Sequence, residues 1–163
     1  MSNSREVKVA IIGAGAIATS HHIPCFLRNK SAQLEALVDV NLRRASRIAR
    51  RFAIKRFYSS MDALLDDVDL DAISICTPPN THSHIAIQAL RRGVNVLCEK
   101  PLASNVEEAS EMINAARNAN RILMTGFNRR FNPVFQKIKT NQAGGRLGRV
   151  YLSEYWCLQG SPL

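Results

Sequence analysis

The feature of this sequence that most restricts its fold is a regular alternation between short apolar runs and segments with helical periodicity. The apolar runs have the length of strands and lie at 7–12, 34–38, 56–58, 72–76, 94–98 and 121–125. Helical patterns separate them, at about 16–28, 42–52, 61–65 and 81–91, with another from 104 onwards. Strands that alternate with helices predict an α/β fold, a doubly wound parallel sheet with helices on both faces. Right-handed crossovers bring the carboxyl ends of all strands to one edge, where a binding site is expected.

Local signals predict where several helices begin and end. Ser104 and Glu107 form an S-x-x-E capping box, which predicts the start of the helix after the fifth strand. Gly93 stands where a left-handed residue is expected to end the preceding helix. Pro24 lies inside the first predicted helix and is expected to end or kink it.

The pattern changes after Phe127. Residues 132–140 are predicted to form a helix, and 149–158 alternate in the manner of an antiparallel strand. A lone strand without a partner is not stable in water. We therefore interpret 127–163 as the incomplete beginning of a second domain and 1–126 as a domain of its own.

A glycine motif follows the first strand. Gly13, Gly15 and Ala18 form the pattern G-x-G-x-x-A, in which the first glycine allows a tight turn and the second lets the backbone approach a pyrophosphate. The next residues, Ala16 and Ile17, begin a helix whose free N–H groups and positive dipole end favour phosphates. The motif therefore predicts a Rossmann-type dinucleotide site.

Asp39 ends the second predicted strand, near the expected spacing of about 20 residues from the glycine motif. A carboxylate at this place accepts a hydrogen bond from the ribose 2′-hydroxyl of NAD and repels the 2′-phosphate of NADP. Arg43 and Arg44 follow closely, and an arginine here can accommodate that phosphate. NAD is the expected cofactor, and NADP remains possible.

The formal net charge of +9 raises the question of nucleic-acid binding. Seven basic residues and no acidic residue lie between Arg43 and Arg56. The apolar residues of 42–52 nevertheless form one helical stripe, and most of the arginines fall outside it. Because no recognition motif or interleaved aromatic residues accompany them, we interpret them as a solvated helix face and expect no nucleic-acid partner.

Cysteines and histidines give little sign of a metal site. The four cysteines are far apart and form no C-x-x-C pair, which is typical of a reduced, cytoplasmic protein. His21 and His22 are adjacent on a predicted helix, so their side chains point in different directions and are poorly placed to bind the same metal ion. No apolar run approaches the roughly 20 residues that cross a bilayer. Lys8 interrupts the apolar-rich N-terminal segment, which argues against a signal peptide. We expect neither a metal nor a membrane association.

The segment VLCEKPLA places an acid, Glu99, and a base, Lys100, at the end of a buried apolar strand. These charges either mark the exit of the strand into solvent or face a bound substrate. Together with GAGAIA, VDVN, CTPPNTHSHIAIQAL and GFNRRFNP, in this order, the segment resembles the Gfo/Idh/MocA oxidoreductases. The resemblance covers nearly the whole chain, and the combination is more specific than any one motif.

The resemblance implies a role for individual residues. The loop beside the cofactor would consist of Thr77, Pro78, Asn80 and His82. Glu99 would lie near the nicotinamide ribose, and Lys100 would be the catalytic lysine, which hydrogen-bonds the reacting hydroxyl or carbonyl. Pro101 would follow a cis peptide bond that aims Lys100 into the site. Asn128 and Arg129 match a motif close to cofactor and substrate.

The resemblance also implies a function and an organisation. It implies an NAD(P)-dependent dehydrogenase that transfers a hydride between a nicotinamide cofactor and a hydroxyl-bearing carbon of a sugar, cyclitol or related polyol. Members of the family carry a catalytic His and Asp in a larger second α/β domain, which supports oligomer contacts and completes the substrate pocket. The chain, which would contain only the beginning of that domain, is therefore expected to be truncated and to bind nucleotide only. The alternative is a non-catalytic NAD(H)-binding or sensing module that pairs with another chain.

Overall fold

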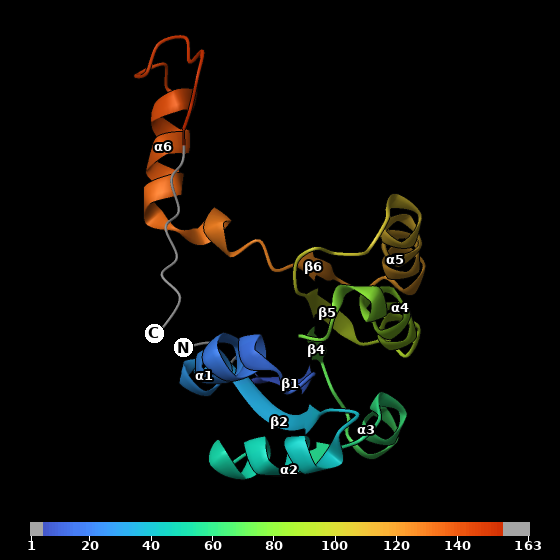
Figure 1. Cartoon of the computed structure of the whole chain (residues 1–163). Helices are drawn as coiled ribbons and strands as arrows, with labels where there is room; N and C mark the ends of the chain where they lie inside the picture. The colour runs from blue at the N-terminus through green and yellow to red at the C-terminus, as the bar shows by residue number, and fades with distance from the viewer. Residues whose placement is uncertain (1–4, 155–163) are drawn as a thin grey trace. The chain divides into compact units, whose positions relative to one another are not determined.

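The computed structural model describes residues 5–154 and divides the chain into two compact units, Met1–Gly126 and Phe127–Leu163. The first unit contains all the strands found in the described residues (Figure 1). They are β1 (Val7–Ile12), β2 (Ala32–Val38), β3 (Arg56–Tyr58), β4 (Ala72–Ile75), β5 (Asn95–Cys98) and β6 (Leu123–Thr125). All six predicted strands are therefore present, with ends that shift by a few residues at most.

The strands form one sheet in the order β3-β2-β1-β4-β5-β6, and every neighbouring pair is parallel. This is the predicted doubly wound α/β sheet, and the strand order identifies it as Rossmann-type. The direction in which the chain builds the sheet reverses between β1 and β4. Ligands of such sheets bind at the carboxyl ends of the strands beside this reversal, so the loops after β1, β2, β4 and β5 frame the expected site.

Helices cover both faces of the sheet, as predicted. They are α1 (Ile23–Arg28), α2 (Leu42–Arg51), α3 (Met61–Asp67), α4 (His82–Arg91) and α5 (Val106–Ala119). Alternate residues of β1 point to opposite faces: Ile11 packs in a core with Ile23 and Ile48, from α1 and α2. Ala10 and Ile12 belong to the opposite core, which α3, α4 and α5 complete. Figure 1 shows α4 and α5 side by side over the β4–β6 half of the sheet.

The first helix contains an irregularity that the sequence pattern did not predict. Residues 16–28 are helical throughout, as expected, but Ala18–His22 form a π-helical turn in which Ile23 donates its N–H to the carbonyl of Ala18. Pro24 stands in the first turn of α1, directly after this wider turn. The proline, which lacks an N–H, is thus accommodated at the start of α1 and does not end the helix.

The predicted capping box of α5 is wrong by one residue. The N-cap is Asn105, whose side chain accepts a hydrogen bond from the N–H of Glu108 at 2.8 Å. Glu108 in turn accepts from the N–H of Ser104 at 3.2 Å. Both S-x-x-E and N-x-x-E fit the sequence, and serine and asparagine cap about equally well. From the cap at Asn105, α5 begins at Val106 and buries Met112 and Ala116 against the core.

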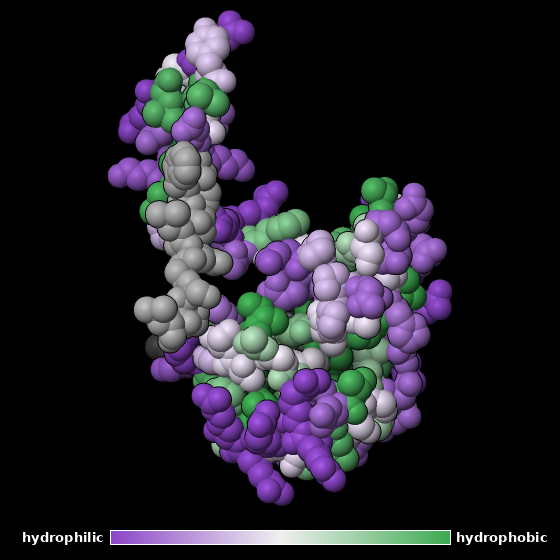
Figure 2. Space-filling view, in the orientation of Figure 1, coloured by the Kyte–Doolittle hydropathy of each residue, from purple (hydrophilic) through white to green (hydrophobic). Residues whose placement is uncertain are grey.

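The arginines of α2 are exposed, whereas Ala45, Ile48 and Ala49 are buried. This matches the prediction of a basic solvated face over an apolar stripe. Figure 2 shows hydrophilic side chains over the surface around α2.

The second unit contains a short 3₁₀ turn, η3 (Asn128–Phe131), and one helix, α6 (Pro133–Ala143), in its described residues. The helix confirms the prediction for 132–140. The strand predicted at 149–158 is wrong for 149–154, which have no regular structure, and 155–158 lie outside the described residues. A strand requires a hydrogen-bonding neighbour, and the described part of this unit contains none.

Candidate functional site

Gly13 forms the turn after β1 and has to be a glycine. Its φ of +99° lies in the left-handed region, and a Cβ atom here would come within 2.9 Å of the carbonyl carbon and oxygen of Cys76. Its N–H donates to the carbonyl of Val38 at 2.7 Å. The glycine therefore lets the turn pack directly against the chain that leaves β4.

Gly15 has a different environment. It is not among the glycines with positive φ, and a Cβ atom added to it would meet no atom of the described residues within 4 Å. The first bond of the following helix runs from the N–H of Thr19 to the carbonyl of Gly15, so the N–H groups of Ala16 and Ile17 have no acceptor within the helix. Open space beside unpaired N–H groups fits a pyrophosphate.

The carboxylate of Asp39 lies beside the same loop, and its side chain is only 5% exposed. One oxygen, Oδ2, accepts from the N–H of Ala14 at 2.9 Å and from Nε of Arg44 at 2.9 Å. The other, Oδ1, accepts from the N–H of Asn41 and from Nη2 of Arg44, both at 2.8 Å. Burial by itself raises the pKa of Asp39, but these hydrogen bonds outweigh it, so the pKa lies below its ordinary value.

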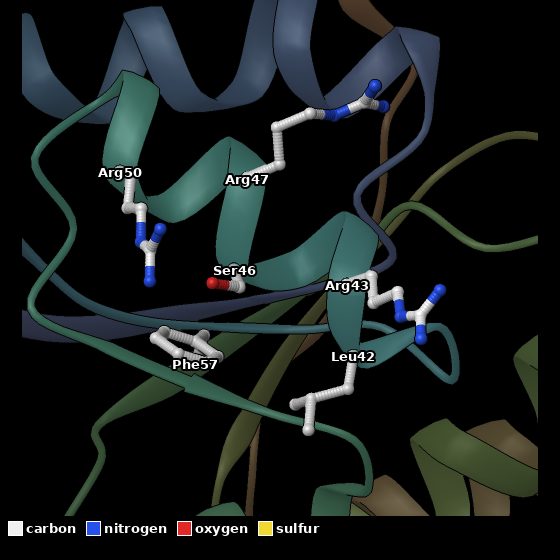
Figure 3. Close-up of a pocket in the computed structure, with 6 residues that line it drawn as sticks. All are labelled: Leu42, Arg43, Ser46, Arg47, Arg50 and Phe57. Atoms are coloured by element: carbon white, nitrogen blue, oxygen red, sulfur yellow. The ribbon is translucent and has the colours of Figure 1, made fainter.

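The sequence left open whether Arg43 or Arg44 acts beside Asp39. Arg44 pairs with it, whereas Arg43 lines a pocket between α2 and β3. Figure 3 shows the pocket, with Ser46 and Phe57 turned toward each other and the guanidinium of Arg43 extending away from Phe57. The full lining is Leu42, Arg43, Ser46, Arg47, Arg50 and Phe57. Arg43 was one of two candidates for a contact with a 2′-phosphate. None of the other residues that line the pocket was predicted to belong to the site.

The loop after β4 carries Thr77, Pro78 and Asn80, and the last two are exposed. The hydroxyl of Thr81 donates to that of Thr77 at 2.7 Å and orders the loop. His82, by contrast, is buried, and its ring nitrogens lie 2.9 Å from the carbonyl of Thr77 and 3.0 Å from that of Pro101. The ring therefore links the loop after β4 to the turn after β5.

The turn after β5 presents Glu99 and Lys100. The Lys100–Pro101 peptide bond is cis, as predicted, and Lys100 is exposed. The Glu99 side chain is 15% exposed, and its Oε2 accepts from the N–H of Lys100 at 3.0 Å. Gly126, at the end of β6, faces Glu99, where a Cβ atom would lie 3.3 Å from Oε1.

One residue of this cluster was missed by the sequence analysis. His22, considered there only as a metal ligand, lies with its Nε2 2.9 Å from Oε1 of Glu99. The two residues are 77 positions apart in the chain, and no local pattern signals such a pairing.

Asn128 and Arg129 lie in η3, in the second unit. Their predicted role toward cofactor and substrate stays a prediction.

Residues 5–154, the part of the chain that the structure describes, contain neither a cluster of metal ligands nor a membrane-spanning helix. No group of three or more His, Cys, Asp or Glu side chains in this range is arranged to hold a metal ion. No helix in the same range has the length and apolarity needed to cross a membrane.

A sequence model of one family, described as an oxidoreductase family with an NAD-binding Rossmann fold, matches residues 7–127. The chain belongs to the Gfo/Idh/MocA oxidoreductase family. The NAD-binding Rossmann fold of the family confirms the type of site that the glycine motif predicted and the cofactor expected from Asp39.

Several members of the Gfo/Idh/MocA family resemble the chain. The myo-inositol 2-dehydrogenase of Thermotoga maritima is 32% identical over 146 residues, which cover 90% of this chain and 43% of the relative. The WlbA dehydrogenase of Bordetella pertussis, solved with NADH and UDP-GlcNAcA, has a TM-score of 0.84 and 28% identity, over 90% of this chain and 45% of that one. A mutant 3-ketoreductase from Actinomadura kijaniata, solved with TDP-benzene and NADP, has a TM-score of 0.82 and 26% identity, over 90% and 46%. The chain thus spans less than half the length of these relatives.

Proposed function

We propose that this chain forms the cofactor site of an NAD(P)-dependent dehydrogenase acting on a hydroxyl-bearing carbon of a sugar, cyclitol or related polyol. One observation carries the proposal. The loop of Gly13 and Gly15 and the turn of Glu99 and Lys100 lie at one edge of the sheet, on opposite sides of the point where the strand order reverses. A dinucleotide bound across this point has its two halves on the two sides. The names of the relatives support the substrate class.

The residues present fit such a cofactor. The N–H groups of Ala16 and Ile17, beside the open space at Gly15, would hold the pyrophosphate. The adenosine ribose would then lie near Asp39 and Arg44, at the end of β2. The other half of the dinucleotide would lie over β4 and β5, within reach of Glu99.

When bound, the nicotinamide supplies the hydride acceptor or donor. The task left to the chain is to bind, orient and polarise. Lys100 is the exposed cation at the carboxyl end of β5, and its Nζ would hydrogen-bond the reacting oxygen of the substrate. A positively charged donor stabilises the oxyanion that develops when the hydroxyl loses its proton. Lys100 is therefore the proposed catalytic residue.

Nucleotide binding and turnover make different demands. The residues assigned to the dinucleotide site, apart from Asn128 and Arg129, lie within the first unit, so we expect the chain alone to bind NADH. Turnover also requires that a substrate be enclosed beside Lys100 and shielded from water. We therefore expect no polyol oxidation by the chain alone.

The test has two parts. In the first, NADH is titrated into the protein and binding is monitored by fluorescence. Both the native chain and Lys100→Ala should show saturable binding. Reduction of NAD⁺ is then assayed against a panel of polyols, with the Thermotoga maritima relative as a positive control. A native chain that binds neither NADH nor NADPH would overturn the proposal. Turnover by the chain alone that survives Lys100→Ala would remove the proposed role of that lysine. A full-length form that binds NADH but oxidises nothing would favour a non-catalytic binding module.

A further inference from the structure

His22 connects three segments that are distant in the sequence. Its Nδ1 lies 2.8 Å from the hydroxyl of Ser74 in β4, and its Nε2 lies 2.9 Å from Oε1 of Glu99 after β5. Ser74 is completely buried, and the side chains of His22 and Glu99 are 11% and 15% exposed. Both ring nitrogens are thus engaged in a largely buried chain of hydrogen bonds that ends at the predicted ligand edge.

The chemistry of Glu99 fixes the proton on one nitrogen of the ring. An ionised carboxylate only accepts hydrogen bonds, so Nε2 of His22 carries a proton and donates to Glu99. In the neutral ring, Nδ1 then accepts from the hydroxyl of Ser74. If Nδ1 is protonated as well, the serine oxygen accepts and its proton can turn toward Sγ of Cys76, 3.9 Å away. The bond to Glu99 is kept in both cases.

Glu99 differs from the other buried carboxylate at this edge. Asp39 accepts four hydrogen bonds, two on each oxygen, which uses its full capacity of about four. Glu99 accepts two in the described part of the chain, from His22 on one oxygen and from the N–H of Lys100 on the other. One acceptor position on each oxygen therefore remains for a ligand.

The position of His22 depends on a rare backbone feature. It is the last residue of the π-helical turn Ala18–His22, directly after the glycine loop. Such turns are uncommon inside helices and occur frequently at functional sites. Within this wider turn the side chain of His22 faces the sheet, where it meets Ser74 and Glu99.

We propose that His22 is a positioning residue: it holds the carboxylate of Glu99 so that the remaining acceptor positions face a ribose hydroxyl of the nicotinamide half of the cofactor. This inference rests on the proposed function and adds a residue to it. His22 acts through Glu99 and does not itself contact the ligand.

The electrostatics of the cluster agree with this geometry. Burial by itself raises the pKa of Glu99, but the hydrogen bonds from His22 and from the N–H of Lys100, with the charges of both residues, hold the pKa below its ordinary value. The other titratable groups nearby are the thiols of Cys76 and Cys98, and burial raises the pKa of each to about 12. They stay neutral, so Glu99 carries the negative charge of the cluster.

Two substitutions of similar size separate positioning from general stability. In His22→Gln the amide nitrogen can take the place of Nε2 and keep the bond to Glu99. In His22→Asn the shorter amide reaches only as far as Nδ1, toward Ser74. We expect the asparagine variant to bind NADH about tenfold more weakly than the native chain, the effect of one hydrogen bond to a charged group. The glutamine variant should stay within about threefold of native binding.

Adjacent His21 provides the matched control. It is exposed, and its ring contacts the hydroxyl of Ser20 in the same helix, so His21→Asn should bind NADH as the native chain does. Glu99→Gln tests the route of the effect. If His22 acts through Glu99, the double variant His22→Asn/Glu99→Gln should bind little more weakly than Glu99→Gln alone, because residues of one network are not additive.

The pH dependence of NAD⁺ binding tests the positioning role directly, because a purely structural role of His22 would leave it unchanged. Loss of the donor destabilises the ionised form of Glu99 and raises its pKa. As the pH is lowered, the affinity of His22→Asn for NAD⁺ should therefore begin to fall at a higher pH than the affinity of the native chain. Thermal unfolding checks each variant, and His22→Leu replaces His22→Asn if that variant does not fold.

The outcomes separate this inference from the proposed function. A native chain that binds neither NADH nor NADPH overturns the proposed function, and the inference with it. A native chain that binds, together with a folded His22→Asn variant of equal affinity and unchanged pH profile, overturns the inference alone. If the losses of NADH affinity in the double variant are additive, His22 acts by a route other than Glu99, and the inference is overturned.

Discussion

Arg44 and Asp39 form a two-point ion pair at the end of β2, with Nε 2.9 Å from Oδ2 and Nη2 2.8 Å from Oδ1. The arginine side chain is 44% exposed and the aspartate side chain 5%. The group that faces solvent at this place is therefore a cation. The carboxylate expected to select NAD has its acceptor positions filled.

This pair predicts the effect of removing the arginine. In Arg44→Leu, two acceptor positions of Asp39 are released for the ribose hydroxyls of NADH, and a partner for the 2′-phosphate of NADPH is lost. We expect the ratio of the Kd for NADPH to the Kd for NADH to rise about tenfold, the effect of one hydrogen bond to a charged group. Fluorescence titration with both cofactors measures it.

Arg43→Leu is the control for this prediction, because Arg43 is the neighbouring arginine and lines the pocket between α2 and β3. Its removal should leave the ratio nearly unchanged. A larger change with Arg43→Leu than with Arg44→Leu would assign the 2′-phosphate to Arg43.

The two glycines of the loop should respond differently to alanine. Gly13→Ala places a Cβ atom 2.9 Å from the carbonyl of Cys76 at a φ of +99°, so we expect the free energy of unfolding to fall by about 2 kcal/mol or more. Gly15→Ala meets no atom of residues 5–154 within 4 Å and should leave stability within about 0.5 kcal/mol. Its methyl group enters the space assigned to the pyrophosphate, so NADH binding should be largely lost.

Urea unfolding and NADH titration of both variants check this pair of expectations. If Gly15→Ala keeps native affinity for NADH, the space beside it does not hold the pyrophosphate.

The start of α5 gives a prediction about stability alone. Asn105 is the N-cap, so Asn105→Ala should lower the free energy of unfolding by about 1 kcal/mol. Ser104→Ala, which removes the cap expected from the sequence pattern, should change it by no more than about 0.5 kcal/mol. Equal effects in chemical denaturation would mean that the helix begins at either residue.

Much of the fold was predictable because its causes are local. Apolar runs of strand length, helical stripes such as that of α2, and the left-handed Gly93 (φ +80°) depend on residues within one turn or one strand. The parallel sheet follows from the alternation of these elements and from the handedness of crossovers. The tight turn at Gly13 was predictable for the same reason, because its steric demand is a property of the turn.

The arrangement within the site needed the tertiary structure. Asn105 in place of Ser104, and Arg44 in place of Arg43 as the partner of Asp39, are choices between neighbours that a sequence pattern treats as equivalent. For the two arginines, the rotation of the packed helix α2 decides, because its apolar residues must meet the core. The strand predicted at 149–158 is absent from its described part, 149–154. The reason is related, since a strand needs a partner as well as an alternating sequence.

His22 shows most clearly what sequence patterns do not predict. By itself the sequence determined that a histidine stands in the first helix. Its contacts with Ser74 and Glu99, 52 and 77 positions away, arise because β4 and β5 are neighbours and because a π-helical turn directs the ring toward them. Hydrogen bonds between distant side chains depend on strand order and on helix rotation. Local patterns leave both free, and the packed fold fixes them.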